Sequence, residues 1–329
     1  MLLRKLISMP VLILLSIFLI SGCGGSDENT ENSQQGGSTQ TVTAPVAKPP
    51  ISAQDIVQQS QDSWHFKFFA ANVARGPEGN QKAHYSDSCI ECHSAVKMFD
   101  DKDAKLADFY PGGKYADQVE GVSCRVCHDF TGFEGIKLRK EGWAVCGDCH
   151  TGEPVLGKAV HHPQNEMIRG VGVGDVSNIP SYKCYNMIDF TCYDCHVTNA
   201  SKHDFMVPGV TVTHDGAART GSTMDYTKFK EVFEQERCKS CHIIPEDIVE
   251  SVRKKQETIS KKLEELKPKY DEWSEKSGTM PKDDPRLKTF MEATTYYTYV
   301  EADSSKGAHN YELAKALLEK AEEKFSQLK

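Results

Sequence analysis

The sequence of 329 residues predicts a mainly α-helical protein with little sheet, in which an irregular body is followed by a bundle of long helices. Three observations predict this class. A Cys-x-x-Cys-His motif occurs five times between residues 51 and 244. Glycine and proline interrupt that segment often, so few windows show a long helical or strand period. From residue 245 onward the period is helical and the composition is charged.

The repeated motif is the attachment site of a c-type haem. Its two thiols reach the two vinyl groups of one porphyrin, and the histidine that follows becomes the proximal ligand of the iron. A lone Cys-x-x-Cys also suits a redox dithiol or half a zinc site, but five copies, each followed by histidine, leave little room for those alternatives. The attachment residues, numbered as haems 1 to 5 in chain order, are Cys89, Cys92, Cys124, Cys127, Cys146, Cys149, Cys192, Cys195, Cys238 and Cys241. The proximal ligands are His93, His128, His150, His196 and His242.

The segment 51–244 is therefore expected to be a pentahaem body. The short pieces between its turns make a conventional side-chain core hard to build. Haems supply the apolar mass in its place, and thioether bonds and axial ligands fix the chain around them. This segment is not expected to fold without haem.

The region 245–329 is expected to be a helical bundle that packs on the body. Apolar residues between Ile248 and Leu266 recur at spacings near three, four and seven, which places them on one helix face. Pro268 is expected to interrupt this helix. Two further helices are expected over 286–300 and 311–329, and a homodimer through these helices is compatible with the pattern.

The first 22 residues are expected to be a lipoprotein signal peptide. Arg4 and Lys5 form a basic start, and the apolar run 11–20 is too short for a membrane span. Small residues precede Cys23, which would become the lipid-carrying first residue of the mature chain. The alternative is an ordinary secretory signal in which Cys23 is incidental.

Residues 23–50 are rich in Gly, Ser, Thr, Gln, Asn and Pro and are expected to be a disordered tether. The expected location is the bacterial cell envelope, with a lipid anchor in a membrane facing the periplasm or the cell exterior. The formal net charge is −8, and removal of the leader makes the chain more acidic. This charge argues against nucleic-acid binding and favours basic redox partner proteins.

Seven histidines remain after the proximal ligands are assigned. A haem iron held by two histidines needs one distal histidine, so most of the seven are candidate ligands. For each, the alternative is a solvated or core histidine. The seven are His65, His84, His161, His162, His203, His214 and His309.

The order of features resembles the pentahaem, ammonia-forming cytochrome c nitrite reductases. The five haem motifs are followed in both by long helices. A His-Pro pair, His162-Pro163, lies between the third and fourth motifs, and His214 lies between the fourth and fifth. A Gly-x-His-Asn sequence, Gly307 to Asn310, separates the last two helices. The resemblance covers roughly residues 51–329.

The resemblance implies particular distal ligands. His214 would be distal at haem 2, and His309 would be distal at haem 4. His65 or His84 would be distal at haem 3. His162 would match the active-site histidine beside haem 1.

The chain also departs from that family. In that family the catalytic haem usually has lysine at the position of His93, although some members have histidine. No tyrosine is present in residues 151–154, where the family has its catalytic tyrosine, and His161 stands where the family has glutamine. These positions also form the family's calcium site, so the departures argue against calcium, although Glu153 and Lys158 remain nearby. His161 offers a ligand that could close haem 1.

Cys184 lies outside the motifs, near the place where the family has the distal histidine of haem 5. Cys184, Met187 or His203 could take that role, and a thiolate would lower the haem potential whereas methionine would raise it. Cys184 could also be a reactive thiol if Lys183 lowers its pKa. The remaining alternative is a buried, unreactive cysteine.

Two main hypotheses about function follow. The first is an electron carrier whose haems connect a quinol-side donor to a terminal reductase in anaerobic respiration. The second is a reductase of nitrite, hydroxylamine or a sulfur oxyanion at haem 1, with His162, His161, Lys158 and Arg75 as proton and charge donors. A third, weaker interpretation is a subunit of a conductive filament. An iron without a sixth ligand would distinguish the second hypothesis from the first.

Overall fold

The computed structural model describes residues 52–74, 76–77, 85–131, 136–140, 144–180, 192–197, 202–215, 218–234, 238 and 242–329. Several sequence predictions lie outside these residues: the signal peptide 1–22, the tether 23–50, Cys23, Arg75, His84, Cys184, Met187 and Cys241.

The body begins with two helices joined at a serine. Helix α1 spans Ala53–Asp62, and its first turn is closed by a capping box in which Ser52 and Asp55 bond each other's backbone N–H groups. Helix α2 spans Trp64–Val73, and the hydroxyl of Ser63 accepts the N–H of Phe66 at its start.

The rest of the body consists of short helices, as the frequent glycine and proline residues predicted. Four of them overlap haem motifs: α4 (Ile90–His93), α6 (Cys124–Cys127), α7 (Ala144–Gly147) and α9 (Cys192–His196). The others are α5 (Ala95–Phe99), η1 (Leu106–Phe109), α8 (Gln164–Arg169), α10 (Tyr226–Phe229) and η4 (Lys230–Val232).

The described residues form two small antiparallel sheets of two strands each. Strands β1 (His128–Asp129) and β2 (Lys137–Leu138) pair beside the second motif. Strands β3 (Val210–Asp215) and β4 (Ala218–Met224) form the other sheet, with a register irregularity between Thr213 and His214. The prediction of a mainly α-helical fold with little sheet is confirmed.

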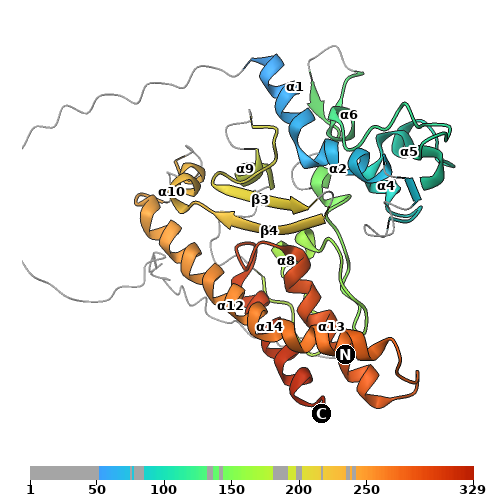
Figure 1. Cartoon of the computed structure of the whole chain (residues 1–329). Helices are drawn as coiled ribbons and strands as arrows, with labels where there is room; N and C mark the ends of the chain where they lie inside the picture. The colour runs from blue at the N-terminus through green and yellow to red at the C-terminus, as the bar shows by residue number, and fades with distance from the viewer. Residues whose placement is uncertain are drawn as a thin grey trace, which may run out of the picture. The chain divides into compact units, whose positions relative to one another are not determined.

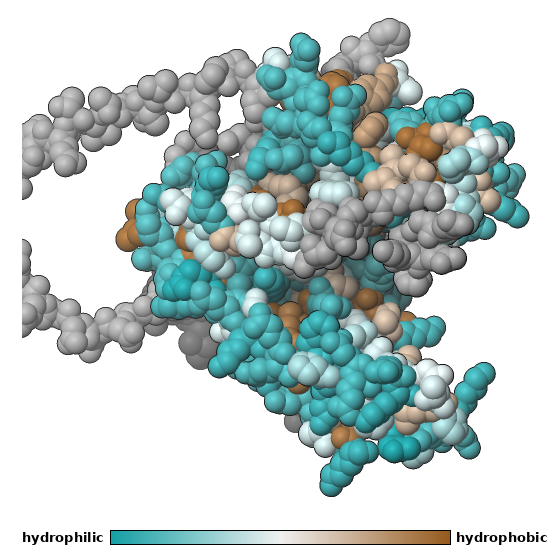
Figure 2. Space-filling view, viewed as in Figure 1, coloured by the Kyte–Doolittle hydropathy of each residue, from teal (hydrophilic) through white to brown (hydrophobic). Residues whose placement is uncertain are grey.

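Three long helices form the C-terminal part of the chain (Figure 1). They are α12 (Pro245–Ser277), α13 (Pro285–Asp303) and α14 (Tyr311–Ser326), and each packs against the other two. Figure 2 shows a largely hydrophilic outer surface over this part of the visible face. Within the described residues, no helix combines the length and apolar character that crossing a bilayer requires.

The predicted interruption at Pro268 is wrong, because α12 continues through that residue. Proline removes one backbone hydrogen bond and crowds the carbonyl four residues earlier. Pro268 and Glu264 both lie on the exposed side of α12, so water can satisfy that carbonyl. Contacts of the buried side chains Ile259, Leu266 and Trp273 hold both halves of the helix.

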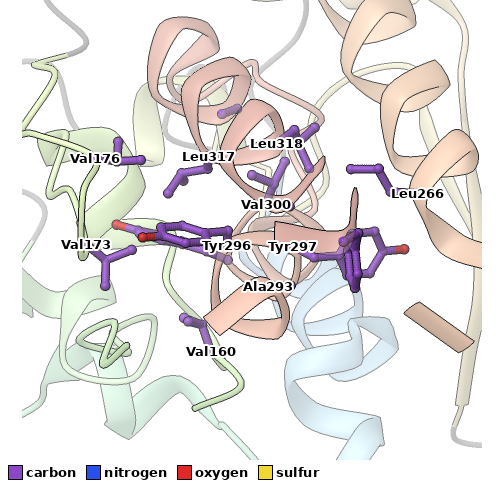
Figure 3. Close-up of a cluster of buried hydrophobic side chains, with 14 of the residues drawn as sticks. Val160, Val173, Val176, Leu266, Ala293, Tyr296, Tyr297, Val300, Leu317 and Leu318 are labelled. Carbon is purple, nitrogen blue, oxygen red and sulfur yellow. The ribbon is translucent and has the colours of Figure 1, made fainter. Parts of the chain in front are cut away.

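The helical part has a conventional side-chain core (Figure 3). Tyr296 and Val300 of α13 pack with Leu317 and Leu318 of α14, and Val160 and other residues of the body join them. Tyr296 and Leu317 have no exposed surface. The C-terminal helices are thus packed on the body, as the sequence predicted.

A second, smaller core lies inside the body around the first haem motif. Ile90 of α4 is fully buried together with Phe69 of α2 and Phe109 of η1. The rings of Phe69 and Phe109 meet edge to face with centroids 5.0 Å apart. Side-chain packing therefore contributes more to this part of the body than the sequence pattern led us to expect.

Threonines of α13 hold the loop that leads to His161 and His162. The hydroxyl of Thr295 accepts the backbone N–H groups of Gly157, at 2.8 Å, and Lys158, at 3.1 Å. It also lies 2.8 Å from the carbonyl of Lys158. The hydroxyl of Thr298 accepts the N–H of Val160 at 2.9 Å. A long-range side-chain contact therefore sets the path of this loop.

Replacement of Thr295 by valine should destabilise the protein by about 2 kcal/mol, because it keeps the shape but leaves buried N–H groups without an acceptor. Denaturant unfolding of the holoprotein would measure this change. The control is Thr289→Val, since the hydroxyl of Thr289 donates to the carbonyl of Pro285 within α13 itself. Equal stability of the two variants would contradict the role given to Thr295.

Candidate haem centres

At the first, second and fourth motifs a single turn of helix brings the two cysteines and the histidine together. At the third motif, helix α7 ends at Gly147 and a turn continues to His150. The N–H of His93 donates to the carbonyl of Cys89 at 3.1 Å, and the N–H of His150 donates to that of Cys146 at 2.9 Å. The second and fifth motifs have the same bond from histidine to first cysteine. Because residues three and four apart share a helix face, both thiols and the imidazole can address one porphyrin.

Attachment cysteines of different motifs are close neighbours. The thiol of Cys92 at haem 1 lies beside that of Cys149 at haem 3. The thiol of Cys146, also at haem 3, lies beside that of Cys192 at haem 4. Cys195 at haem 4 lies within electrostatic range of the cysteine Cys238 of haem 5. The motifs therefore follow one another in space in the order 1, 3, 4, 5.

The second motif branches from this series at haem 3. Cys127 of the second motif lies within electrostatic range of both Cys146 and Cys149. The third motif is consequently adjacent to three others. The order of the motifs in space therefore differs from their order in the sequence.

Four proximal histidines each face a second histidine ring. A metal–imidazole bond of about 2 Å on each side of an iron places two ring centroids roughly 6 Å apart. The observed centroid separations are 6.0 Å for His93 and His162, 6.2 Å for His128 and His203, 5.8 Å for His150 and His65, and 6.4 Å for His196 and His309. The residues present therefore fit iron held between paired imidazoles.

Burial keeps most of these imidazoles neutral. It lowers the pKa of His65 to about 3, and the charges of neighbouring histidines act in the same direction. Burial likewise lowers the pKa values of His93, His162 and His196 to about 4. A neutral imidazole has the lone pair that a metal ion needs.

Hydrogen bonds to Nδ1 orient several of the rings. Nδ1 of His150 lies 3.3 Å from the side-chain oxygen of Gln164, and Nδ1 of His196 lies 3.0 Å from the carbonyl oxygen of Phe205. Nδ1 of His309 lies 2.6 Å from a carboxylate oxygen of Asp303. Such bonds leave Nε2 of each ring available to a metal. Sequence reasoning missed Gln164, Phe205 and Asp303, because no local motif marks them.

The pKa of His309 is shifted in the opposite direction from the pKa values of His65, His93 and His196. Burial opposes its positive charge, but the charge of Asp303 and the hydrogen bond between the two side chains outweigh burial and raise the pKa of His309. Asp303 has no exposed side-chain surface. The imidazole and the carboxylate therefore form a pair at the fourth motif in which Asp303 is buried and His309 is partly exposed.

His162 adopts an uncommon backbone conformation between two haem motifs. Its φ angle is +52°, in the left-handed region that non-glycine residues rarely occupy. Its ring stacks on that of His161 with centroids 4.1 Å apart, and it lies 6.1 Å from His150 as well as 6.0 Å from His93. Such outliers persist where surrounding structure imposes them, often at functional sites.

The structure does not gather all of the residues expected for a reductase. His162 lies beside His93, and the exposed His161 stacks on His162. The side chain of Lys158 is exposed, whereas its backbone is bound by Thr295. Arg75 lies outside the described residues.

The structure places another candidate, His203, at the second motif, and the expectation that His214 is distal at haem 2 stays a prediction. The ring of His203 lies opposite His128, and its Nδ1 is buried without a hydrogen-bond partner. The backbone N–H of His203 donates to the side chain of Gln59 in α1, which fixes this approach. His214 lies in β3, and its side chain is outside the description.

Haem 5 is described less fully. His242 is half-buried, and the ring of Phe233 meets it edge to face at 5.7 Å. Among side chains that the structure describes, no histidine ring lies opposite His242. Of the candidates for this position, Cys184 and Met187 lie outside the described residues and His203 lies opposite His128, so the distal ligand of haem 5 stays a prediction.

Comparisons with known proteins point to one kind of fold. No model of a protein family matches the chain, and no curated protein sequence is similar to it. The outer cell wall cytochrome OcwA is 26% identical with a TM-score of 0.55, covering 82% of this chain and 50% of that one. An undecahaem cytochrome from the S-layer of Carboxydothermus ferrireducens is 26% identical with a TM-score of 0.48, covering 81% of this chain and 41% of that one.

The cytochrome c nitrite reductase from Desulfovibrio desulfuricans is 15% identical with a TM-score of 0.52, covering 80% of this chain and 69% of that chain. The fold is therefore that of a multihaem cytochrome c, and its resemblance to cytochrome c nitrite reductase is confirmed at the level of the fold. The chain spans half the length of OcwA.

Proposed function

We propose that this chain is a lipid-anchored, extracytoplasmic cytochrome c that transfers electrons through five covalently bound haems in anaerobic respiration. The observation that carries this proposal is the pairing of four proximal histidines with second histidine rings about 6 Å away. When bound, each haem supplies a one-electron ferric–ferrous couple. Paired imidazoles leave an iron no position for substrate, which suits electron transfer.

The distal ligands follow from this pairing. His162 serves haem 1, His203 serves haem 2, His65 serves haem 3 and His309 serves haem 4. Contacts between attachment cysteines support a path through haems 1, 3, 4 and 5, with haem 2 joining at haem 3. The chain's own role is to hold neighbouring haems at short, fixed separations.

Location and partners are part of the same proposal. OcwA is described as an outer cell wall cytochrome, which supports a position outside the cytoplasm. Cys23 would carry the lipid, and the acidic chain suits basic redox partners such as a quinol-side donor or a terminal reductase. A homodimer through α12–α14 stays a prediction.

The alternative function is a reductase of nitrite, hydroxylamine or a sulfur oxyanion at haem 1. It requires an open iron position beside His93, with His162 and His161 as donors. The 6.0 Å separation of His93 and His162 resembles that of the other three pairs, and this similarity favours a closed site. The absence of tyrosine from residues 151–154 points in the same direction.

Low-temperature electron paramagnetic resonance of the fully oxidised holoprotein tests the proposal. We expect only low-spin ferric signals from the haems, because each iron would carry two strong axial ligands. A high-spin signal of about one iron per chain would mean that one haem has an open iron position. This result would contradict the carrier hypothesis, and assays with nitrite, hydroxylamine and sulfite would follow.

His162→Ala separates the two functions at haem 1 itself. If His162 is the distal ligand, this substitution should convert one of five low-spin signals to high-spin and allow cyanide to bind. His161→Ala is the matched control, since His161 is exposed and stacks on His162 without facing His93. An unchanged spectrum in His162→Ala would show that another group closes haem 1 and would refute this ligand assignment.

A further inference from the structure

Asp303, the last residue of α13, is a buried carboxylate whose two oxygens have separate partners. Oδ1 lies 2.6 Å from Nδ1 of His309. Oδ2 accepts the backbone N–H and the hydroxyl of Ser305. The Asp303 side chain has no exposed surface, so water does not screen its charge.

The loop between Asp303 and His309 is held in an unusual shape. Ser304, Lys306 and Gly307 have φ angles of +60°, +54° and +86°. A Cβ atom at Gly307 would come within 3.0 Å of Ile259 in α12, so this close approach favours glycine. The backbone N–H of His309 donates to the hydroxyl of Ser305 at 3.1 Å. Packing and these bonds maintain the strained loop, and the loop presents His309 to Asp303.

The other oriented imidazoles have neutral partners. His150 meets the amide oxygen of Gln164, and His196 meets the backbone carbonyl of Phe205. Among the described histidines, His309 alone is bonded to a carboxylate. The end of α13 is also linked to the third motif through Gln164. Its amide nitrogen donates to the carbonyl of Ala302 at 2.9 Å, and its amide oxygen contacts Nδ1 of His150.

We propose that Asp303 is a positioning residue that lowers the midpoint potential of haem 4. A carboxylate that accepts the Nδ1 proton makes the imidazole a stronger electron donor to its metal. Its buried negative charge also favours the ferric iron, which carries one more positive charge than the ferrous iron. This inference rests on the proposed function, in which His309 is the distal ligand of haem 4.

A lower potential at haem 4 has a consequence for the electron path. The fourth motif lies between the third and fifth in the order of cysteine contacts. Asp303 would therefore shift electron occupancy away from haem 4 and towards haems 3 and 5. The carboxylate would in this way influence the step through haem 4 between the two ends of the series.

Asp303→Asn tests this inference in a spectroelectrochemical titration of the holoprotein. Asparagine keeps an oxygen for the Nδ1 proton but removes the charge. At the wild-type midpoint of haem 4, we expect the ferrous-to-ferric ratio to rise about tenfold, a positive shift of about 59 mV for one electron. The other components should stay in place.

Two further variants control the test. His309→Met replaces an imidazole of haem 4 by a thioether, which raises the potential and so marks the haem 4 component. Ser305→Ala removes the hydroxyl that donates to Oδ2 and accepts the His309 N–H, but it keeps the backbone N–H on Oδ2 and the contact of Oδ1 with the His309 ring. It loosens the loop without removing the charge, so it should not shift that component. A shift in Ser305→Ala equal to that in Asp303→Asn would overturn the inference in favour of a purely structural role.

Failure of this inference is distinguishable from failure of the proposed function. If His309→Met moves no component, His309 is not a ligand and the ligand assignment fails. If it does move one but Asp303→Asn leaves that component unchanged, only the role of Asp303 is refuted. If Asp303→Asn does not assemble, the test uses the wild-type protein, in which Asp303 is intact. His309→Met and His203→Met identify the redox components of haem 4 and haem 2. We expect the wild-type midpoint potential of haem 4 to be lower than that of haem 2, and a higher potential at haem 4 overturns the inference.

Discussion

Removal of haem 3 by the double substitution Cys146→Ala/Cys149→Ala is expected to prevent the body from assembling. The third motif is adjacent to the first, second and fourth through its cysteines. Loss of a buried Phe or Trp side chain costs about 3–5 kcal/mol, and a haem is larger than either. The cost should therefore exceed that range, and the other haem sites would lose a neighbour at once.

Haem content per chain and far-ultraviolet circular dichroism would measure this effect. The matched control is Cys124→Ala/Cys127→Ala, which removes haem 2 from the branch of the series, where Cys124 is exposed. We expect the control to retain four haems and most of its stability. If the haem 3 variant also retained four haems and melted at the same temperature, the body would not depend on haem 3.

Leu317→Ala in α14 is expected to destabilise the helical part by about 2–5 kcal/mol, because it removes apolar contacts and leaves a cavity in a well-packed core. Leu317 has no exposed surface and belongs to the cluster that joins α12, α13 and α14 (Figure 3). Denaturant unfolding followed by circular dichroism measures this change.

The control for Leu317→Ala is Lys315→Ala on the exposed face of α14. Lys315 forms an ion pair with Glu319 at 3.8 Å, and exposed pairs of this kind contribute at most about 1 kcal/mol. If Leu317→Ala lowered the free energy of unfolding by less than 1 kcal/mol, the helical part would contribute little to the stability of the protein. The haem spectrum should stay unchanged in both variants, since neither residue contacts a motif histidine.

The two predictions separate two sources of stability in one chain. The helical part has a conventional core, with residues such as Tyr296 and Leu318 in mutual contact. In the body, side-chain packing is concentrated around Ile90 and Phe69 near the first motif. The remaining motifs lie in short helices whose side chains are only partly buried, and haem must complete their packing.

Residue spacing alone was enough to predict the fold class and the cysteines expected to carry haem. Attachment chemistry is local, because a cysteine pair and the next histidine lie in a single turn, as at Cys89 and His93. The helical period after residue 245 was equally local, although Pro268 proved compatible with α12 because it is exposed. Signals of this kind can be found from spacing alone.

Which motifs are neighbours and which histidines face each other depends on long-range contacts that residue spacing does not reveal. The pairing of His128 with His203 joins residues far apart in sequence, and their spacing carries no sign of it. The contact of His309 with Asp303 depends on a strained loop that glycine and packing against Ile259 maintain. Distal ligation depends on the folding of the whole chain, so its geometry follows from long-range packing and not from any motif.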